Sequence, residues 1–234
     1  MVKDIILADS DGRELGAILD SNITVDTNGE YEFSVQIARS NWYSELTFSS
    51  YVYITETEYG GIIGEVLTDT TLDYVELKGI TWRGRLQYKV IEPPAGSDYK
   101  TVSGELNQVM KTLIEPEFDG LFRVSSEDTG ISVKNFQFDR YSTLLEGLTK
   151  MLQSVGYRLQ IRLIKEQDEP CYILVEAVPI TDYSAQIELS QDSRLNFTMD
   201  DKQNGVNHLV VTGKGEMPVS YTHLRAHETL MNLV

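Results

Sequence analysis

The stretch of residues 59–94 constrains the fold more than any other part of the sequence. Two glycines, Gly60 and Gly61, are followed by one apolar run at residues 62–67 and a second at residues 75–80. The polar residues 68–73 between the runs form a short connection of the kind that joins antiparallel strands. The pattern therefore predicts a β-hairpin, which leads through Gly84, Arg85 and Leu86 into a further apolar pair, Val90 and Ile91.

A second strand signal lies upstream of this hairpin. Tyr31, Phe33, Val35 and Ile37 alternate with polar residues, which is the period-two pattern of a strand with one buried face. We therefore expect a half-buried strand over these positions.

The connections in the first ninety residues are also predictable. Asp11-Gly12 and Asn28-Gly29 are hairpin signals, because glycine readily takes the positive φ that primed turns need. Residues 41–46 predict a short helical turn, and residues 51–55 predict a return to extended structure. Together these features predict that the first part of the chain is built from β-strands.

The periodicity changes after the breaker cluster at residues 93–97, which contains Pro93 and Pro94. The apolar residues at 106, 109, 110, 113 and 114 fall on one face of a helix, with Ser103 as the expected N-cap and Pro116 as the stop. The cluster is therefore the best boundary between two domains.

A second amphipathic helix is predicted from about Ser142 to Gly156, with Gly147 on its polar face, where glycine weakens a helix modestly. Strands are expected after it at residues 157–163, 172–178, 186–189 and 208–212. Strands cluster and there is no regular βαβ alternation, so the predicted class is α+β with β-structure dominant.

Five segments occur in an order that resembles the N-terminal region of the tail-tip (baseplate) hub and tail-associated proteins of siphophages: residues 15–20, 28–35, 61–65, 144–148 and 207–213. The resemblance extends over about residues 15–216. It implies two β-barrel-like hub domains with inserted helices. It also implies a ring, usually of three copies, that joins the distal tail ring to the parts that contact the host.

From this resemblance we expect the chain to consist of three parts. Residues 1–94 are an N-terminal β-rich hub domain, and residues 95–217 are a helix-containing α+β second hub domain. Since hub chains continue further, the second domain is expected to be incomplete, with an unpaired sheet edge around Val210. Residues 218–234 are the third part. Their sequence from Val219 to Thr229 resembles the translation of a transposon-based sequencing adapter, so we exclude them, with His223 and His227, from fold reasoning.

The net charge of −16 argues against a nucleic-acid-binding surface, because affinity for phosphates comes mainly from Lys and Arg. It argues equally against docking on anionic membranes, and simple solubility is the competing explanation. No apolar run approaches membrane-spanning length, and residues 1–12 lack a secretory signal, so synthesis in the host cytoplasm is expected. Cys171 is the only cysteine and is expected to be a small buried residue on a strand.

The search for chemistry yields no catalytic residue, no cofactor-binding residue and no metal ligand. His208 is the only histidine outside the adapter-like tail, and one His with one Cys cannot form a usual zinc site. Residues 213–215 are too short for a phosphate loop. Residues 200–205 faintly resemble a calcium loop but place Lys202 at a ligand position, and residues 9–12 suit a hairpin better.

The aromatic residues offer a different hypothesis. Thirteen tyrosines and two tryptophans, Trp42 and Trp82, are candidates for a sugar-binding groove or a subunit contact, although strand faces and the core are their commoner positions. Trp82 lies beside Arg83 and Arg85 at the expected end of a strand. We therefore take it as the first candidate for an assembly contact.

The function that follows is a non-enzymatic structural subunit of the phage or prophage tail tip, located in the virion tail. Its expected partners are other copies of itself in a ring, which the resemblance implies is a trimer, together with the distal tail protein and other tail-tip proteins. Direct nucleic-acid binding and membrane insertion are not expected. The alternatives are a carbohydrate-binding module and the N-terminal part of a tail-associated cell-wall hydrolase.

Overall fold

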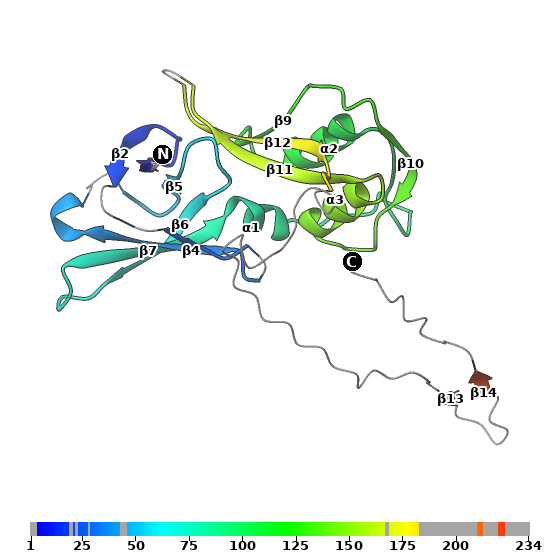
Figure 1. Cartoon of the computed structure of the whole chain (residues 1–234), viewed down its shortest axis with the longest axis horizontal. Helices are drawn as coiled ribbons and strands as arrows, with labels where there is room; N and C mark the ends of the chain where they lie inside the picture. The colour runs from blue at the N-terminus through cyan, green and yellow to red at the C-terminus, as the bar shows by residue number, and fades with distance from the viewer. Residues whose placement is uncertain are drawn as a thin grey trace, which may run out of the picture. The chain divides into compact units, whose positions relative to one another are not determined.

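The computed structural model describes residues 4–18, 21, 23–27, 29–42, 46–166 and 169–182, and the backbone of two short strands at 210–212 and 220–222. The chain divides into two units, Met1–Thr181 and Asp182–Val234 (Figure 1). The first unit contains nearly all of the described elements and is β-dominated with a few helices, so the predicted α+β class is confirmed.

A seven-stranded antiparallel sheet forms the first part of this unit. The spatial order of its strands is β2-β1-β5-β6-β7-β4-β3. The strands are β1 (Ile5–Ala8), β2 (Glu14–Ile18), β3 (Ile23–Val25), β4 (Glu32–Ala38), β5 (Tyr51–Tyr53), β6 (Gly60–Thr68) and β7 (Tyr74–Thr81).

The predicted central hairpin is confirmed. Strands β6 and β7 pair antiparallel with Ile62 opposite Ile80. In the turn between them, one carboxylate oxygen of Asp69 accepts hydrogen bonds from the backbone N–H and the hydroxyl of Thr71, at 2.8 and 2.6 Å. A polar connection that satisfies its own backbone in this way fixes the register of the two strands.

The Asp11-Gly12 hairpin signal is also confirmed, with Gly12 at a φ of 78° between β1 and β2. At the second signal β3 and β4 pair as expected, whereas Asn28 lies outside the described residues. There the positive φ falls on Tyr31, at 56°, and not on Gly29. The carbonyl of Tyr31 accepts hydrogen bonds from the backbone N–H and the hydroxyl of Thr81, which hold that residue in place.

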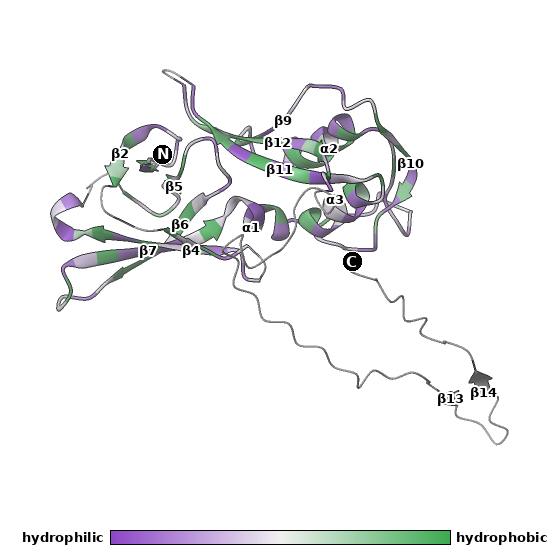
Figure 2. Cartoon of the chain, viewed as in Figure 1, coloured by the Kyte–Doolittle hydropathy of each residue, from purple (hydrophilic) through white to green (hydrophobic). Residues whose placement is uncertain are grey.

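Strand β4 has the predicted alternation, because Phe33, Val35 and Ile37 are buried and Glu32 and Gln36 are exposed. The buried residues belong to an apolar cluster on one face of the seven-stranded sheet (Figure 2). The members of this cluster are Ile5, Leu7, Ile18, Phe33, Val35, Ile37, Leu46, Val52, Ile63, Val75 and Leu77.

Two short helical elements differ from expectation. A 3₁₀ turn, η1, occupies Arg39–Asn41, slightly before the predicted turn at 41–46, of which residues 43–45 lie outside the described part. Strand β7 ends at Thr81, and the helix α1 (Trp82–Gln87) follows immediately. The hydroxyl of Thr81 caps α1 by accepting a hydrogen bond from the N–H of Gly84, so Trp82 begins a helix and does not end a strand.

Two smaller sheets and two helices form the second part of this unit (Figure 1). Strand β12 lies between β11 and β9, with β9 parallel to it, and β8 pairs with β10. The elements are β8 (Thr101–Glu105), α2 (Leu106–Ile114), η2 (Glu115–Glu117), β9 (Phe122–Val124), β10 (Ser132–Gln137), α3 (Leu144–Gln153), β11 (Tyr157–Ile164) and β12 (Tyr172–Pro179). Helix α2 packs on β9 and helix α3 on β11.

Both predicted amphipathic helices are present, with one error in a cap. The N-cap of α2 is Glu105, whose carboxylate accepts a hydrogen bond from the N–H of Gln108 at 2.8 Å. Ser103 was wrong as the cap, because it lies two residues earlier in β8, where its hydroxyl accepts from the N–H of Asn135. Pro116 lies in the 3₁₀ turn η2 that ends the helix, as expected.

Helix α3 begins after the cap Thr143, and Gly156 follows it with a φ of 76°. The placement of Gly147 on the polar face was wrong. Gly147 is buried, and a Cβ there would lie 2.5 Å from Cδ1 of Ile91 and 2.9 Å from Cδ1 of Phe138. Because Gly147 has no side chain, Ile91 and Phe138 can pack directly on the helix.

A second apolar cluster crosses the proposed boundary between residues 94 and 95. It joins Tyr51, Tyr53, Trp82 and Leu86 to the buried faces of α2, α3, β11 and β12. Backbone hydrogen bonds cross as well: the N–H of Cys171 donates to the carbonyl of Gly12, and the N–H of Glu56 donates to the carbonyl of Leu163. The division at 94 and 95 remains our proposal, and the two parts share one core.

In the second unit, β13 (Val210–Thr212) pairs antiparallel with β14 (Ser220–Thr222). Val210 is thus paired on one side, with Thr222, which lies in the adapter-like range. The strand expected at residues 186–189 lies outside the described residues.

Candidate interaction surface

Most of the residues singled out for chemistry in the sequence lie outside the part of the chain that the structure describes. His208, residues 200–205 and residues 213–215 lie outside the described part of the chain. Within the described part, no three His, Cys, Asp or Glu side chains gather in a way that could hold a metal ion. Among the same residues, no helix is long and apolar enough to cross a membrane.

The turn at residues 9–12 has the local geometry of a hairpin. One carboxylate oxygen of Asp9 accepts hydrogen bonds from the N–H groups of Asp11 and Arg13, at 2.9 and 2.8 Å. This oxygen is therefore used to hold the backbone of the turn, in agreement with the reading of residues 9–12 as hairpin chemistry.

Cys171 is buried just before β12, as predicted. Burial raises the pKa of its thiol to about 11, which keeps the sulfur neutral near pH 7. A neutral, buried thiol is a weak nucleophile, so Cys171 contributes packing between β12 and the turn at Gly12.

Trp82 was wrong as the candidate for an assembly contact. Its side chain is fully buried, and its ring meets the ring of Tyr51 edge-on, with centroids 5.7 Å apart. Trp82 therefore packs in the apolar core that the two parts of the first unit share. Trp42, by contrast, is 40% exposed at the end of η1.

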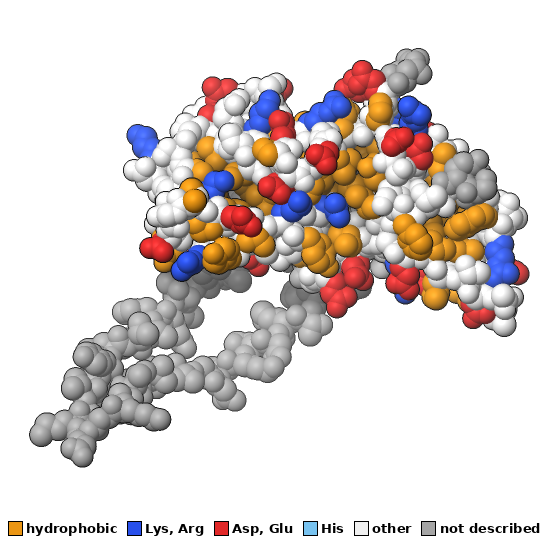
Figure 3. Space-filling model, turned by 180° about the vertical axis from the view of Figure 1, so that it is seen from behind, with side chains coloured by type: hydrophobic (Ala, Val, Ile, Leu, Met, Phe, Trp, Pro, Cys, Tyr) orange, Lys and Arg blue, Asp and Glu red, His pale blue; other side chains and the backbone are white. Residues whose placement is uncertain are grey.

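The exposed hydrophobic side chains that follow α1 define a different candidate. Tyr88, Val90, Tyr99 and Tyr141 are 63, 48, 46 and 60% exposed, which is unusual for residues of this size. Figure 3 shows such side chains reaching the surface between acidic and basic ones on the face opposite to that of Figure 1. Clustered exposed aromatic residues are typical of protein–protein contact sites.

Three adjoining hollows lie along this segment, and we call them together the 88–97 trough. The first, of about 540 Å³, is lined by residues 29–32, Gln87 and Tyr88. The second, of about 460 Å³, shares Tyr88 with the first and extends to Glu92. The third, of about 350 Å³, shares Glu92 with the second and is lined by residues 92–97 and Tyr141. Each pair of neighbouring hollows thus shares one lining residue, Tyr88 or Glu92.

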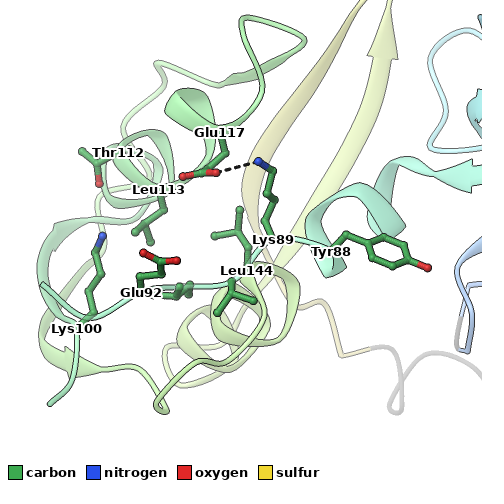
Figure 4. A pocket seen from close by; sticks show the side chains of 10 residues that line it. Tyr88, Lys89, Glu92, Lys100, Thr112, Leu113, Glu117 and Leu144 are labelled. Carbon is green, nitrogen blue, oxygen red and sulfur yellow. Dashed lines mark hydrogen bonds and ion pairs between the residues drawn. The ribbon is translucent and has the colours of Figure 1, made fainter. Parts of the chain in front are cut away.

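Both helices of the second part help to build the middle hollow (Figure 4). Leu113 and Thr112 of α2 line one side, and Leu144 at the start of α3 lines the other. Lys89 and Glu117 form an ion pair at 3.0 Å across the hollow, and Lys100 and Glu92 lie at the end away from Tyr88. The exposed lining is therefore mostly polar, with charges of both signs, and Leu113 and Leu144 are largely buried beneath it.

Sequence reasoning missed the trough. One available signal was Glu92, which follows Val90 and Ile91 and directly precedes Pro93, because a residue that precedes proline is restricted to extended backbone. Tyr31 and Tyr141 come from distant parts of the sequence and carried no comparable signal.

No protein-family model matches the sequence, and no curated protein matches it. Two solved structures are similar to the chain. The prophage MuSo2 43 kDa tail protein from Shewanella oneidensis is 13% identical with a TM-score of 0.45, over 74% of this chain and 52% of that one. A tail protein from Neisseria meningitidis MC58 is 16% identical with a TM-score of 0.45, over 95% of this chain and 68% of that one. This chain thus spans about half the length of the Shewanella protein.

Proposed function

We propose that this chain is a non-enzymatic structural subunit of a bacteriophage or prophage tail. In the proposal it belongs to the tail-tip hub, where copies form a ring that connects the distal tail to host-contacting parts. The observation that carries the structural role is the 88–97 trough, a row of neighbouring hollows with exposed Tyr88, Val90 and Tyr141. The class of assembly comes from the ordered segments between residues 15 and 216.

Both similar structures are of tail proteins, and one of these comes from a prophage. With TM-scores of 0.45 these likenesses do not carry the proposal, which depends on the residues of this chain.

Ring formation makes a specific demand on the surface. In a closed cyclic oligomer each subunit presents two different patches that are complementary to each other. The trough supplies one concave patch of this kind. Its exposed tyrosines, Tyr88 and Tyr141, are of a residue type that is enriched in contacts between subunits.

The charge gives the proposal a second consequence. Each copy carries −16, so a ring places several times this charge around its central opening. Like charges repel, and DNA passing through the opening would not adhere to the wall. We expect the purified protein to be washed from immobilised duplex DNA at low salt, and its retention there would contradict this part of the proposal.

Native mass spectrometry together with negative-stain electron microscopy tests the proposal as a whole. The expected result is one closed oligomer, with three copies as the first expectation, visible as rings. A monomer at every concentration would contradict it. Release of peptidoglycan fragments by the protein, or glycan binding by an isolated monomer, would favour the hydrolase or the carbohydrate-binding alternative instead.

A further inference from the structure

The tight turn between η2 and β9 contains an Asp-Gly pair in left-handed backbone conformation. Asp119 and Gly120 have φ values of 47° and 86°, and the N–H of Leu121 donates to the carbonyl of Phe118 at 2.9 Å. These are the features of a type I′ turn, in which both central residues have positive φ. Glycine takes this conformation readily, whereas a residue with a side chain does so at a cost in free energy. Asp119 therefore occupies a strained position.

The peptide unit between Asp119 and Gly120 is not held by hydrogen bonds. Within the described part of the chain, neither the carbonyl of Asp119 nor the N–H of Gly120 has a partner. Both residues are exposed, and among the same described residues the carboxylate of Asp119 forms no hydrogen bond or ion pair. A Cβ placed on Gly120 would have no atom within 4 Å. The peptide unit can therefore rotate, and the carboxyl group can approach it.

Rotation of this peptide unit brings the reacting atoms together. It converts the type I′ turn into a type II′ turn, in which ψ of the first central residue is about −120°. The hydrogen bond from Leu121 to Phe118 is of the kind that both turn types contain. At this ψ the nitrogen of Gly120 is eclipsed with the Cβ of Asp119, which is the arrangement that a five-membered ring through Cγ requires.

We propose that the Asp119–Gly120 peptide is a site of spontaneous modification, at which aspartate becomes isoaspartate through a cyclic succinimide. The nitrogen of Gly120 attacks Cγ of the protonated carboxyl of Asp119. An N–Cγ bond forms, and the amide proton and the hydroxyl group leave as water.

Hydrolysis of the ring completes the reaction. Water that adds at Cγ breaks the new bond and restores aspartate. Water that adds at the main-chain carbonyl carbon of Asp119 breaks the original bond to Gly120, so the chain then runs through Cβ and Cγ. One water is lost and one is gained, so the mass does not change and no oxidant or cofactor takes part. The proposal is independent of ring assembly.

The turn between β1 and β2 contains the same dipeptide, Asp11–Gly12, in a different state. The N–H of Gly12 donates to the carbonyl of Asp9 at 3.1 Å, and its carbonyl accepts from the N–H of Cys171 at 3.0 Å. A Cβ on Gly12 would lie 3.2 Å from Sγ of Cys171. Rotation of the Asp11–Gly12 peptide would break the hydrogen bond to Asp9. The fold should therefore slow the reaction at Asp11 and not at Asp119.

Isoaspartate at position 119 would disturb the packing around the turn. It inserts one methylene into the backbone between Phe118 and Phe122, which are both buried with ring centroids 4.4 Å apart. The residue before Phe118 is Glu117, which pairs with Lys89 at 3.0 Å across the middle hollow of the trough. A longer backbone cannot keep the tight turn, so we expect the modified protein to be less stable.

Peptide mapping of the unmodified chain tests the proposal. The protein is incubated for several weeks at about pH 6, where a small fraction of aspartate carboxyls is protonated. Isoaspartate is then counted in each peptide by labelling with a protein isoaspartyl methyltransferase. Asn28 and Asn204 also precede glycine, but their deamidation raises the mass of the peptide, so the map separates it.

The two Asp-Gly sites provide the matched comparison. In the folded protein isoaspartate should form about fivefold faster at Asp119 than at Asp11, because the hydrogen bond of the Gly12 N–H must break first. In urea that unfolds the chain, the two rates should become nearly equal, because the dipeptides are identical. Equal rates in the folded protein would overturn the proposal. A ratio that persists in urea would also contradict it, because the turn would then not be the cause.

A variant tests the effect on stability. Asp119→Glu keeps the charge, but its side chain would have to close a six-membered ring, which forms more slowly. Each protein is compared with its own fresh sample, so any direct effect of the substitution cancels. Ageing should lower the thermal midpoint of the unmodified protein more than that of Asp119→Glu. Equal falls would show that isoaspartate at 119 does not disturb the turn.

Discussion

The β6–β7 hairpin and the segment 89–92 are both extended and lie on either side of α1, but they differ in how their edges are used. Strand β7 is bonded to β6 and β4 over its whole length, whereas β6 is bonded to β7 along the hairpin and, among the described residues, to the β5 side only as far as Ile63. The segment 89–92 is bonded only to residues 142–144. The comparison shows that the same backbone conformation supports stability where a sheet continues, and offers a contact surface where the chain passes between sheets.

The largest expected effect is a loss of stability when a side chain is added where β6 and β7 pack closely in the hairpin. A Cβ on Gly79 would collide with the carbonyl oxygen of Ile62 and lie 2.8 Å from Cε1 of Phe33. We expect Gly79→Ala to lower the free energy of unfolding by about 3 kcal/mol, at the upper end of overpacking costs, as measured by urea denaturation. Gly64 in the same hairpin has open space around it, and Gly64→Ala should change stability by less than about 0.5 kcal/mol. Equal effects of the two substitutions would refute the close packing.

The next prediction concerns the support beneath the segment 89–92. Helix propensity alone predicts that Gly147→Ala stabilises α3 by up to about 1 kcal/mol. The structure predicts the opposite sign, because the added Cβ would lie 2.5 Å from Cδ1 of Ile91, which is part of the segment. We expect a net loss of about 1–2 kcal/mol. A higher thermal midpoint for this variant would show that Gly147 does not hold residue 91 in place.

A smaller effect is expected at the cap of α2, the helix that lines one side of the middle hollow. Glu105→Ala should cost about 1 kcal/mol, because the carboxylate caps the N–H of Gln108 and also accepts from Thr129. The exposed Glu127 has no such role, and Glu127→Ala should change stability by less than about 0.5 kcal/mol. Equal losses of stability for the two variants would show that the Glu105 side chain does not cap α2.

The same carboxyl gives a pH dependence. Burial acts to raise the pKa of Glu105, but the hydrogen bonds from Thr129 and from the N–H of Gln108 outweigh this and lower it. A lowered pKa stabilises the fold above the unfolded-state value of about 4.3, and this contribution disappears as the pH falls through the folded-state value. The stability difference between the unmodified protein and Glu105→Gln should therefore be constant near pH 7 and shrink below about pH 4. A difference that grows on acidification would contradict the assignment.

The smallest effect is expected in the trough itself. Tyr88 is 63% exposed, so Tyr88→Ser should change the free energy of unfolding by less than about 0.5 kcal/mol. If the trough is a contact surface, the same variant should still weaken assembly in sedimentation velocity. A large loss of stability would instead place Tyr88 among the residues that hold the fold.

The hairpin, the alternating strand β4 and both amphipathic helices were predictable, because each has a local apolar period. Helix α1 was not, since six residues are too few to establish a period, and the alternation of β7 appeared to continue into Trp82. Residue type favours Ser103 over Glu105 as an N-cap, and only the pairing of β8 with β10 places the cap at Glu105. Gly147 was misplaced because the packing of Ile91 on α3 is a tertiary contact.

The candidate surface was the least predictable part, for a physical reason. Its residues are exposed, so they show no buried periodicity, and its walls come from residues near 30, 90, 112 and 141. The exposure of Val90 depends on which backbone groups pair with residues 142–144, and residue types do not encode this. The resemblance to hub proteins indicated self-assembly but gave no location for the contact.

A cryo-electron microscopy structure of the assembled chain is the most direct test of the account. We expect a closed ring in which the 88–97 trough of each copy is covered by a neighbouring copy. A ring whose troughs face solvent along their whole length, or particles that contain a single copy, would contradict it.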